Sequence, residues 1–563
     1  MTQQGRTGVR SRPGRRTLVA ATTVALSALL LAGCGSGGGE TTAEGEDFDF
    51  SGKDVAAMED YGVGDTFQAT EPVEFGLFYR DHPNYPLNED WLLFQQLAEN
   101  QNVSFDIVAA PLSEWDQRKS LVVGAGDAPE IISVTYPGQE VPFVAGGAIL
   151  PASDYVQYMP NYMDKVEKWG LEEDLDQLRQ EDGKYYVFPG FREEPRAEYS
   201  FAVRADIWEE LGLSLEPATF EDFKEQLETV KEAYPDLYPM TDRWSANGPL
   251  EGTLSFVSPN FGTQAGWGYS QGLTWDEDAG EFIYTGASDQ YRELVDYYAS
   301  LVEDGLLDPE AVTQDDDQAI QKFASGQALS IGTNDQEIVR YRTTIEELGT
   351  DAEIAMIRVP AGPAGDLFQF GQRLVSGFML SSEVTESENF LAMLQFLDWL
   401  YYSDEGLEFA KWGVEGETYT KDGDKRVLNE NITAMGLNPG APENLQADYG
   451  FSNGVFTLVH GSTVDLDRSM LREEVLEFLD KMSTKKVREF PPPAPLDEIE
   501  REQVSLYQSS LKDHVWQNTS QFILGQRPMD EWDAYVSELE GMNMNEYLEV
   551  VNGARERFAE ANG

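Results

Sequence analysis

The side chains that most often carry catalysis or bind metals are sparse in this sequence of 563 residues. It contains one cysteine and three histidines, and the histidines are far apart at His82, His460 and His514. No HExxH motif or His/Cys cluster accompanies them, so a zinc site is not expected. A GxxxxGK[ST] nucleotide-binding loop is also absent from the sequence. The pattern predicts neither a cofactor nor a bound metal.

Paired carboxylates are the remaining route to an enzyme, because glycoside hydrolases use two acids. The sequence has 101 acidic residues, and pairs such as Glu193 and Glu194 or the run 315–317 are expected at that density. These pairs therefore give little support to catalysis, and we predict that the protein is not an enzyme. A secreted carbohydrate-active hydrolase and a polysaccharide-adhesion lipoprotein are kept as alternatives.

Two acidic loops resemble calcium-binding loops only in part. The loop at 274–286 begins with Asp276 and Asp278, but it lacks the glutamate that closes an EF-hand loop. The acids around 422–424 do not match the pattern either. We predict a β-hairpin at both places.

A positively charged leader precedes the only cysteine, Cys34. Five arginines and no acid occupy residues 1–16, and an apolar run at 18–31 follows. This order is typical of an export signal, and the run is shorter than the roughly 20 apolar residues that span a bilayer. The stretch LAGC at 31–34 resembles the lipobox of bacterial lipoproteins, which implies cleavage after residue 33 and a lipid on the Cys34 thiol. The arginine pair at 15–16 leaves Sec and twin-arginine export both open.

The segment after the cysteine and the charge of the whole chain are consistent with an exported protein. Residues 34–65 are rich in Gly, Thr, Glu and Asp, which predicts a flexible acidic tether. No cysteine remains for a disulfide, and lipid alone would hold the protein to the membrane. The net charge is −61, or about −66 without the leader arginines, which argues against nucleic acid as a partner.

Strands and helices alternate through the first part of the mature chain. Hydrophobic periodicity predicts strands at 73–81, 103–110 and 130–138, with helices at 88–101 and 113–129 between them. This order predicts a parallel sheet with crossover helices, in which ligands lie at the carboxyl ends of the strands. The residues at those ends are Tyr79, Arg80, Asp81, Thr135 and Tyr136.

A second alternating section begins near residue 198. Its clearest helix is 289–309, whose apolar residues share one face. Strands are predicted at 328–335, 352–360 and 373–380, and the tail from 497 to 563 is predicted to be helical.

Three stretches carry a resemblance to a known family. DGKYYVFPG (182–190) followed by YSFAVRADIWEELGL (199–213) resembles extracellular solute-binding proteins of ABC importers. The stretch WGVEGETY (412–419) is similar to the WGxEGxTY signature of the oligosaccharide-binding lipoprotein branch. Residues 519–554 resemble the C-terminal helices of that branch, and the resemblance runs through most of 66–563. Trp412 lies in a helical apolar context, which favours a structural role.

The resemblance implies an α/β fold of two lobes, a type II periplasmic-binding-protein clamshell in which helices flank a mainly parallel sheet in each lobe. Lobe I is expected to comprise 66–195 and 356–450, and lobe II 196–355 and 451–563. The resemblance also implies that the lobes close on an oligosaccharide and present it to ABC permease subunits. We expect a monomer held at the outer face of the bacterial membrane.

Sugars combine apolar faces with hydroxyl edges, so we looked for aromatic and planar polar side chains near the predicted strand ends and lobe crossings. The candidate ligand contacts are Arg80, Asp81, Tyr136, Arg192, Trp244, Asn247, Trp267, Tyr269, Asn334, Asp335 and Arg373. Arginines can hold a uronate carboxylate through two hydrogen bonds. Acids follow Arg80 and Arg192 directly and would compensate them, so we expect a neutral or weakly anionic oligosaccharide.

The lipobox resemblance leads to a direct prediction. Mass spectrometry of the N-terminus from the native host should find cleavage between residues 33 and 34 and a lipid-modified Cys34. A variant with Cys34→Ser, expressed in the same host, should stay uncleaved at this position and lack the lipid. An unmodified cysteine within an intact leader would contradict the prediction.

Overall fold

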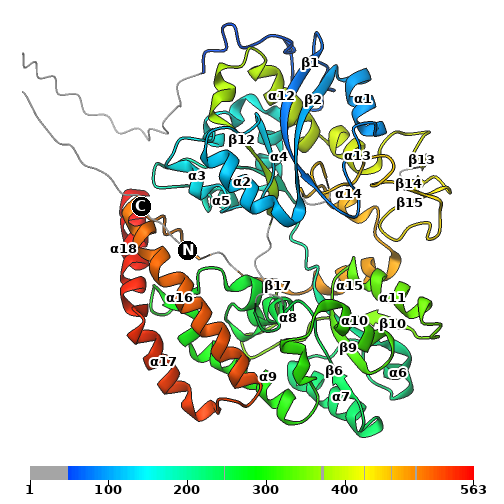
Figure 1. Cartoon of the computed structure of the whole chain (residues 1–563), viewed down its shortest axis with the longest axis vertical. Coiled ribbons are helices and arrows are strands. Elements are labelled where there is room, and N and C mark those ends of the chain that lie inside the picture. The colour runs from blue at the N-terminus through cyan, green and yellow to red at the C-terminus, as the bar shows by residue number, and fades with distance from the viewer. Residues whose placement is uncertain are drawn as a thin grey trace, which may run out of the picture. The chain divides into compact units, whose positions relative to one another are not determined.

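Two β-sheets, each with its own hydrophobic core, organise the folded chain (Figure 1). The computed structural model describes residues 48–245, 248–368, 373–423, 425–457, 460–488 and 491–562. The leader, Cys34 and the first part of the predicted tether therefore lie outside the described residues.

The first sheet has the strand order β2-β1-β3-β12-β4. Its strands are β1 (Val73–Asp81), β2 (Val103–Pro111), β3 (Ile131–Thr135), β4 (Phe188–Phe191) and β12 (Leu374–Leu380). Strand β1 runs parallel to β2 and β3, whereas β12 is antiparallel to β3 and β4. All five residues of β3 are buried, including Ser133 and Thr135, because the strand lies in the middle of a covered sheet.

Helices surround this sheet and complete the first lobe. They are α1 (Leu92–Asn100), α2 (Trp115–Gly124), α3 (Val141–Val144), α4 (Pro160–Trp169), α5 (Glu172–Asp176), α12 (Phe390–Tyr402), α13 (Asp404–Trp412) and α14 (Val464–Arg468). Nearly every residue of α12 is buried, and its carboxylate Asp398 accepts hydrogen bonds from Asn161 and Tyr162 at the start of α4. Trp412 is fully buried in the same core, which agrees with a structural role.

The second sheet has the order β10-β5-β9-β6. Its strands are β5 (Ser200–Arg204), β6 (Tyr238–Met240), β9 (Ala328–Thr333) and β10 (Ile354–Met356). Only β6 and β9 are parallel, so this sheet is less parallel than the sequence led us to expect. The chain enters the lobe at Ser200, opposite the end of β9 at Thr333, and β5 must therefore run antiparallel to β9.

Helices around the second sheet form the second lobe. They are α6 (Ala205–Glu210), α7 (Phe220–Ala233), α8 (Glu251–Val257), α9 (Asp289–Glu303), α10 (Asp316–Ala324), α11 (Glu337–Glu347) and α15 (Glu473–Met482). The predicted face of α9 is buried. Two predicted hairpins are confirmed: β7 (Leu273–Asp276) pairs with β8 (Glu281–Tyr284), and β13 (Tyr419–Asp422) pairs with β14 (Lys425–Leu428).

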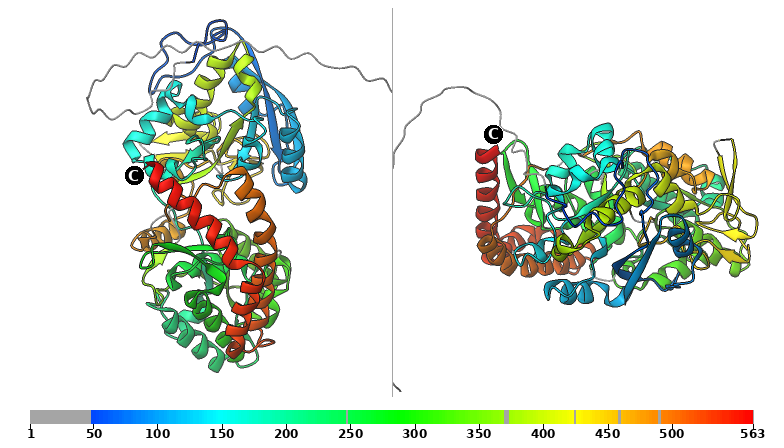
Figure 2. Two further views of the ribbon diagram at one scale, coloured as in Figure 1. Left: turned by 90° about the vertical axis from the view of Figure 1, so that its left-hand side faces the viewer. Right: turned by 90° about the horizontal axis from the view of Figure 1, so that it is seen from above.

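Three helices form the predicted helical tail. They are α16 (Glu498–Ile523), α17 (Trp532–Gly541) and α18 (Met544–Asn562). Helix α16 packs beside α9 and α18, so the tail belongs to the second lobe (Figures 1 and 2). Among the described residues, no helix combines the length and the apolar character needed to cross a bilayer.

The two cores divide the chain at somewhat different points from those expected. The second core extends through Val359, because the chain completes β10 before it returns to the first lobe. The first core extends through Met470, because α14 packs against it. Residues 48–65, expected to be tether, pack on the first lobe, where Met58 donates its N–H to Gln395 and Tyr61 its hydroxyl to Asp398.

Candidate functional site

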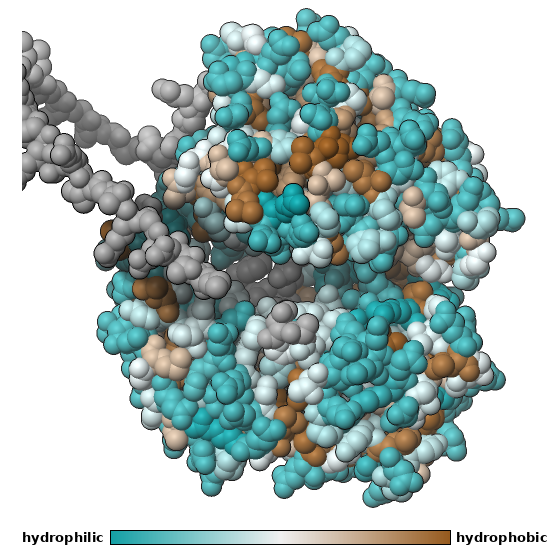
Figure 3. All heavy atoms as spheres, in the orientation of Figure 1, coloured by the Kyte–Doolittle hydropathy of each residue, from teal (hydrophilic) through white to brown (hydrophobic). Residues whose placement is uncertain are grey.

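A cavity of about 350 Å³ lies between the two lobes, and we call it the interlobe cavity. The surface is hollowed between the lobes, and hydrophilic residues dominate both rims on the face shown in Figure 3. The first lobe contributes the turn after β3, helix α13 and the segment 452–470, while the second contributes the turn after β9. The crossing at 192–199 lies along it, and its lining residues are Tyr136, Arg192, Arg196, Glu198, Tyr199, Asn334, Asp335, Gln336, Val375, Lys411, Met435, Ser452, Thr457, Gly461, Asp467, Met470 and Leu471.

Arg196, on the crossing between β4 and β5, joins the two lobes through two carboxylates. Its guanidinium contacts Asp335 of the second lobe and lies 2.9 Å from Asp467 of helix α14 in the first lobe. Its side chain is 11% exposed, so the pair is largely withdrawn from water. Burial alone would raise the pKa of Asp467, but Arg196 and Lys411 outweigh it and lower that pKa. Burial raises the pKa of Asp335 in spite of the neighbouring Arg196.

Charges around the interlobe cavity are closely compensated. Arg192 pairs with Glu198 at 2.6 Å, and Lys411 lies 3.9 Å from Asp467. Burial lowers the pKa of Lys411 to about 8. The cavity lining thus offers three cations, Arg192, Arg196 and Lys411, and the three carboxylates described here, so it carries no formal excess of either sign.

Three aromatic rings stand together beside this cavity, and one of them, Tyr199, lines it. The ring centroids of Tyr199, Trp244 and Trp267 lie 5.3–5.7 Å apart in mostly edge-to-face contacts. Trp267 is 44% exposed, and Tyr136 on the opposite lobe is 40% exposed. Large exposed rings flanking a polar cavity are suited to contact the apolar face of a ligand.

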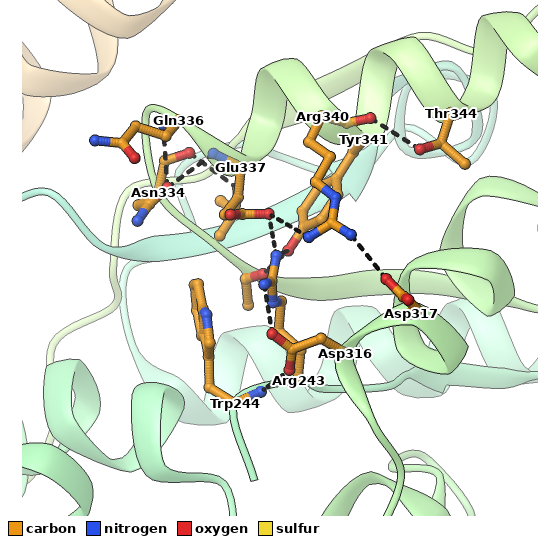
Figure 4. A network of polar contacts seen from close by, with 12 residues as sticks. Arg243, Trp244, Asp316, Asp317, Asn334, Gln336, Glu337, Arg340, Tyr341 and Thr344 are labelled. Carbon is orange, nitrogen blue, oxygen red and sulfur yellow. Dashed lines mark hydrogen bonds and ion pairs between the residues drawn. The ribbon is translucent and has the colours of Figure 1, made fainter. Parts of the chain in front are cut away.

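A buried ion network fixes the position of Trp244 (Figure 4). Asp316 accepts a hydrogen bond from the Trp244 N–H at 2.9 Å and pairs with Arg243 at 2.6 Å. Arg243 is almost fully buried, also contacts Glu337, and lies 4.7 Å from the Trp244 ring centroid. The Trp244 backbone has a left-handed φ of 62°, a strained conformation that persists only where its surroundings hold it.

The backbone that positions Tyr136 is strained as well. Val134, near the end of β3, has a φ of 48°, which is unfavourable for a β-branched residue. Its carbonyl accepts a hydrogen bond from buried Lys119 at 3.2 Å, and this contact holds the turn that leads to Tyr136. Backbone strain at Trp244 and at Val134, two residues before Tyr136, is typical of functional sites.

Several predicted contacts meet at this site. Tyr136, Arg192, Asn334 and Asp335 line the interlobe cavity. Trp244 and Trp267 reach it through their contacts with Tyr199. Asn334 also accepts hydrogen bonds from Gln336 and Glu337 at the start of α11, so its orientation is fixed by the helix that follows (Figure 4).

Two predicted contacts are wrong, because both side chains are used inside one lobe. Tyr269 is 1% exposed and packs between Tyr284 and Tyr291 in the second core. Arg373 donates to the backbone carbonyls of Trp169 and Gly170, so it clamps the end of α4 and does not line the cavity.

Arg80 and Asp81, which were also predicted to contact the ligand, are not part of the interlobe cavity lining. Asp81 accepts the Leu87 N–H at 2.8 Å, which makes it a turn residue, and it is not part of the cavity lining. Arg80 beside it is partly buried at the end of β1, and it forms no ion pair within the part of the chain that the structure describes. Asn247 lies outside the described residues. Compensation by the next residue in sequence was also wrong: Arg192 pairs with Glu198, while Glu193 accepts from the Val464 N–H.

Comparison with known proteins identifies the family. The sequence profile of the bacterial extracellular solute-binding proteins matches residues 84–406, which is more than half of the chain. The chain belongs to the bacterial extracellular solute-binding protein family. Members of this family are binding components, so this solute-binding protein is not an enzyme.

Relatives with known names and structures extend over most of this solute-binding protein. The fructooligosaccharide ABC transporter substrate-binding protein FusA of Streptococcus pneumoniae is 23% identical over 88% of this chain and 93% of its own length. Its structure with kestose aligns with a TM-score of 0.62 over 87% of this chain and all of the other chain. The polygalacturonan/rhamnogalacturonan-binding protein YtcQ of Bacillus subtilis is 22% identical over 59% of this chain and 64% of its own length.

The alginate-binding protein AlgQ2 is similar in fold. Its structure without calcium ion aligns with a TM-score of 0.66 and 17% identity over 87% of this chain and 99% of the other. These structural likenesses confirm the two-lobed α/β fold. In the solute-binding protein described here, no group of three or more metal-ligating side chains converges within the described residues.

A hydrolase-like GxSxG pattern is present in the sequence but has no catalytic context in this solute-binding protein. Residues 268–272 read GYSQG and match GxSxG, in which the serine sits on a strand-to-helix turn. Here Ser270 follows a 3-10 turn at Gly266–Tyr269 and precedes strand β7. None of the three histidines, all of which are described, lines the cavity that Ser270 borders.

The sequence analysis missed five charged or aromatic residues of the site. They are Arg196, Glu198, Tyr199, Lys411 and Asp467. One signal was available, since Arg196 to Tyr199 lie on the same crossing as the chosen Arg192. Lys411 and Asp467 are far apart in sequence and meet only because α13 and α14 pack in the first lobe.

Removing the Arg196 charge should destabilise the solute-binding protein. Arg196→Met leaves Asp335 and Asp467 without their shared cation, and breaking a buried pair typically costs about 3–5 kcal/mol. Without Arg196, burial is left to raise the pKa of both carboxyl groups, so in the variant they take up protons as the pH falls and the cost of the unpaired charges decreases. The loss should therefore be larger at pH 7 than at pH 4.5 in urea unfolding followed by tryptophan fluorescence.

Arg340→Met provides the control for this experiment. Arg340 lies on α11, pairs with Asp317 at 2.7 Å and is 48% exposed, so its replacement should cost less than about 1 kcal/mol. A loss in the Arg196 variant that is as small as in the control, or equal at both pH values, would contradict the assigned role.

Proposed function

We propose that this protein is the lipid-anchored, extracellular receptor of an ABC importer and that it captures an oligosaccharide in the interlobe cavity. One observation carries the proposal: exposed rings from both lobes, Tyr136 and Trp267, flank a polar cavity with compensated charge. The named specificities of FusA, YtcQ and AlgQ2 are all carbohydrates, which supports the same class of ligand. The lipobox resemblance at Cys34 supports the anchor.

The chemistry of the cavity suits a sugar. A pyranose or furanose ring presents C–H groups on its faces, which pack on aromatic rings, and hydroxyl groups on its edges, which exchange hydrogen bonds with polar side chains. Tyr199 supplies a ring in the lining, with Trp244 and Trp267 packed beside it, and Glu198, Asn334 and Asp335 of the same lining supply acceptors. A ligand bound here would contact both lobes at once.

The charges favour a neutral or weakly anionic sugar. Arg192, Arg196 and Lys411 already have carboxylate partners, and Arg243 is buried between Asp316 and Glu337. A polyuronate would have to displace these partners and approach a chain whose net charge is strongly negative. Arg80, which has no ion pair among the described residues, leaves room for a single acidic group.

Closure of the lobes on the sugar would report occupancy to the transporter. A ligand that contacts both lobes stabilises the closed arrangement more than the open one, and this difference is what shifts the population. The permease subunits would then recognise the closed form and take up the cargo. We expect the receptor to act as a monomer, because the proposed site is complete within one chain.

Calorimetric titration of the mature protein tests the proposal. Gluco-, xylo- and fructo-oligosaccharides, oligogalacturonates and long polymers should be compared at low and at high salt. We expect a neutral series to bind with a dissociation constant of about 1 μM or tighter, about −8 kcal/mol or more favourable, with little dependence on salt. Binding confined to oligouronates would contradict the neutral preference, and binding confined to polymers would favour an adhesion protein.

The aromatic wall can be tested separately. Trp267→Ala should weaken the sugar that binds by about tenfold, or about 1.4 kcal/mol, because the ring loses its contact with the ligand. Tyr238→Ala is the control, since Tyr238 is 39% exposed on the second lobe and lies outside the interlobe cavity. Equal affinities for Trp267→Ala and the parent protein would mean that the sugar binds elsewhere.

A further inference from the structure

A second cavity, of about 380 Å³, also lies between the lobes. We call it the amide cavity, because the side chains of Gln177, Gln264 and Gln271 line it. Gln177 follows helix α5 in the first lobe, while Gln264 and Gln271 flank the 3-10 turn Gly266–Tyr269 in the second. Like the interlobe cavity, the amide cavity is thus bordered by both lobes.

Short segments of chain connect the linings of the two cavities. Tyr136 lines the interlobe cavity and Gly138 lines the amide cavity, and both belong to one turn that is closed by a hydrogen bond from the Gln139 N–H to the Tyr136 carbonyl. On the second lobe, Trp267 contacts Tyr199 of the interlobe cavity, and Ser270, three residues later, lines the amide cavity. The turn that carries Tyr136 and the stretch from Trp267 to Ser270 therefore lie beside both cavities.

The backbone of the second-lobe turn is held in an unusual conformation. Gly266 has a φ of 55°, and a Cβ at this position would lie 1.9 Å from the Glu251 carbonyl oxygen, so only glycine fits. Ser270 has a φ of 46°, which is strained for a residue with a side chain. This turn places Trp267 and Gln271 on opposite sides of Tyr269, whose ring is anchored in the core.

The lining of the amide cavity combines amide side chains with two arginines that already have partners, Arg179 with Asp176 and Arg501 with the Leu496 carbonyl. Within the part of the chain that the structure describes, the amide groups of Gln177, Gln264 and Gln271 make no hydrogen bond to other protein groups. A neutral amide offers two donors and one acceptor oxygen, which matches the hydroxyl edges of sugars and has no preference for charge. The carboxyl of Glu140 is buried and accepts the Gly138 N–H at 2.8 Å, so it adds no exposed negative charge.

Prolines contribute apolar groups to the lining of the amide cavity. Residues 491–495 read PPPAP and line the cavity beside Phe282. Proline fixes its own φ, so this wall loses little conformational entropy when a ligand packs on it. The amide cavity thus combines apolar rings with amide groups, much as the interlobe cavity combines aromatic rings with polar side chains.

We propose that the two cavities form one elongated site, in which the amide cavity binds the sugar units of an oligosaccharide that extend past Tyr136 and Trp267. The inference rests on the proposed function and adds a specificity to it: Gln264, Gln271 and Gln177 select for chain length. Short oligosaccharides occupy the interlobe cavity alone, and longer ones gain affinity from the amides.

A length series measured by calorimetry tests this assignment. Gluco-, xylo- and fructo-oligosaccharides of two to six units are titrated into the mature parent protein and into the double variant Gln264→Ala/Gln271→Ala. We expect the parent to bind longer members of the preferred series more tightly. The double variant should lose about tenfold for the longest member and less than about twofold for the shortest one that binds, because only the longest reaches the amides.

Two further variants make the outcome unambiguous. Gln526→Ala is the matched control, since Gln526 is exposed in the turn after α16 and lines neither cavity. Gln177→Ala approaches the amide cavity from the first lobe and replaces the double variant if that one does not fold. Its loss of affinity should depend on sugar length in the same way, and the change in binding free energy should be about half that of the double variant.

The results separate this inference from the proposed function. Equal weakening at every length, or no weakening at any length, would overturn the elongated site while leaving the sugar receptor intact. Absence of binding by the parent protein to every sugar would overturn both.

Discussion

The placement of Arg196 between Asp335 and Asp467 is the interaction on which the site depends. The chain carries a strongly negative charge, and carboxylates from two lobes approach one another at the base of the interlobe cavity. Without a cation between them, their repulsion in a largely buried setting would hold the lobes apart. Arg196 lies on the crossing segment itself, so the residue that connects the lobes covalently also compensates their charges.

A second buried arginine pairs with carboxylates from two helices within the second lobe. Arg243 is nearly fully buried and joins Asp316 of α10 to Glu337 of α11, and Asp316 in turn holds the backbone of Trp244 (Figure 4). A strained aromatic residue beside the cavity is thus supported by an ion network that exists before any ligand binds. Pre-organisation of this kind reduces the entropy that binding must overcome. It also explains why so many arginines lie near the cleft without forming a general anion-binding site.

Two pairs of residues with similar chemistry and similar places in the sequence have different surroundings in the structure. Arg192 and Arg373 both border lobe crossings in the sequence, yet Arg192 lines the cavity and Arg373 binds the end of α4. Trp267 and Tyr269 are two residues apart in one glycine-rich stretch, yet the first is exposed at the cleft and the second is buried in the core. Spacing along the chain does not distinguish these cases, because a 3-10 turn rotates neighbouring side chains toward different surroundings.

The sequence alone determined many of the elements, because hydrophobic periodicity reports which face of a strand or helix is buried, and the resemblance to a known family implied the two-lobed architecture. The bounds of β1, the buried face of α9 and both hairpins follow from such local patterns. Only the tertiary structure decided which charges meet. Arg196 with Asp467 and Arg243 with Asp316 are pairs separated by long stretches of chain, and packing of the lobes brings them together. The same packing brings Gln177 of the first lobe and Gln264 and Gln271 of the second to one cavity, which no local pattern encodes.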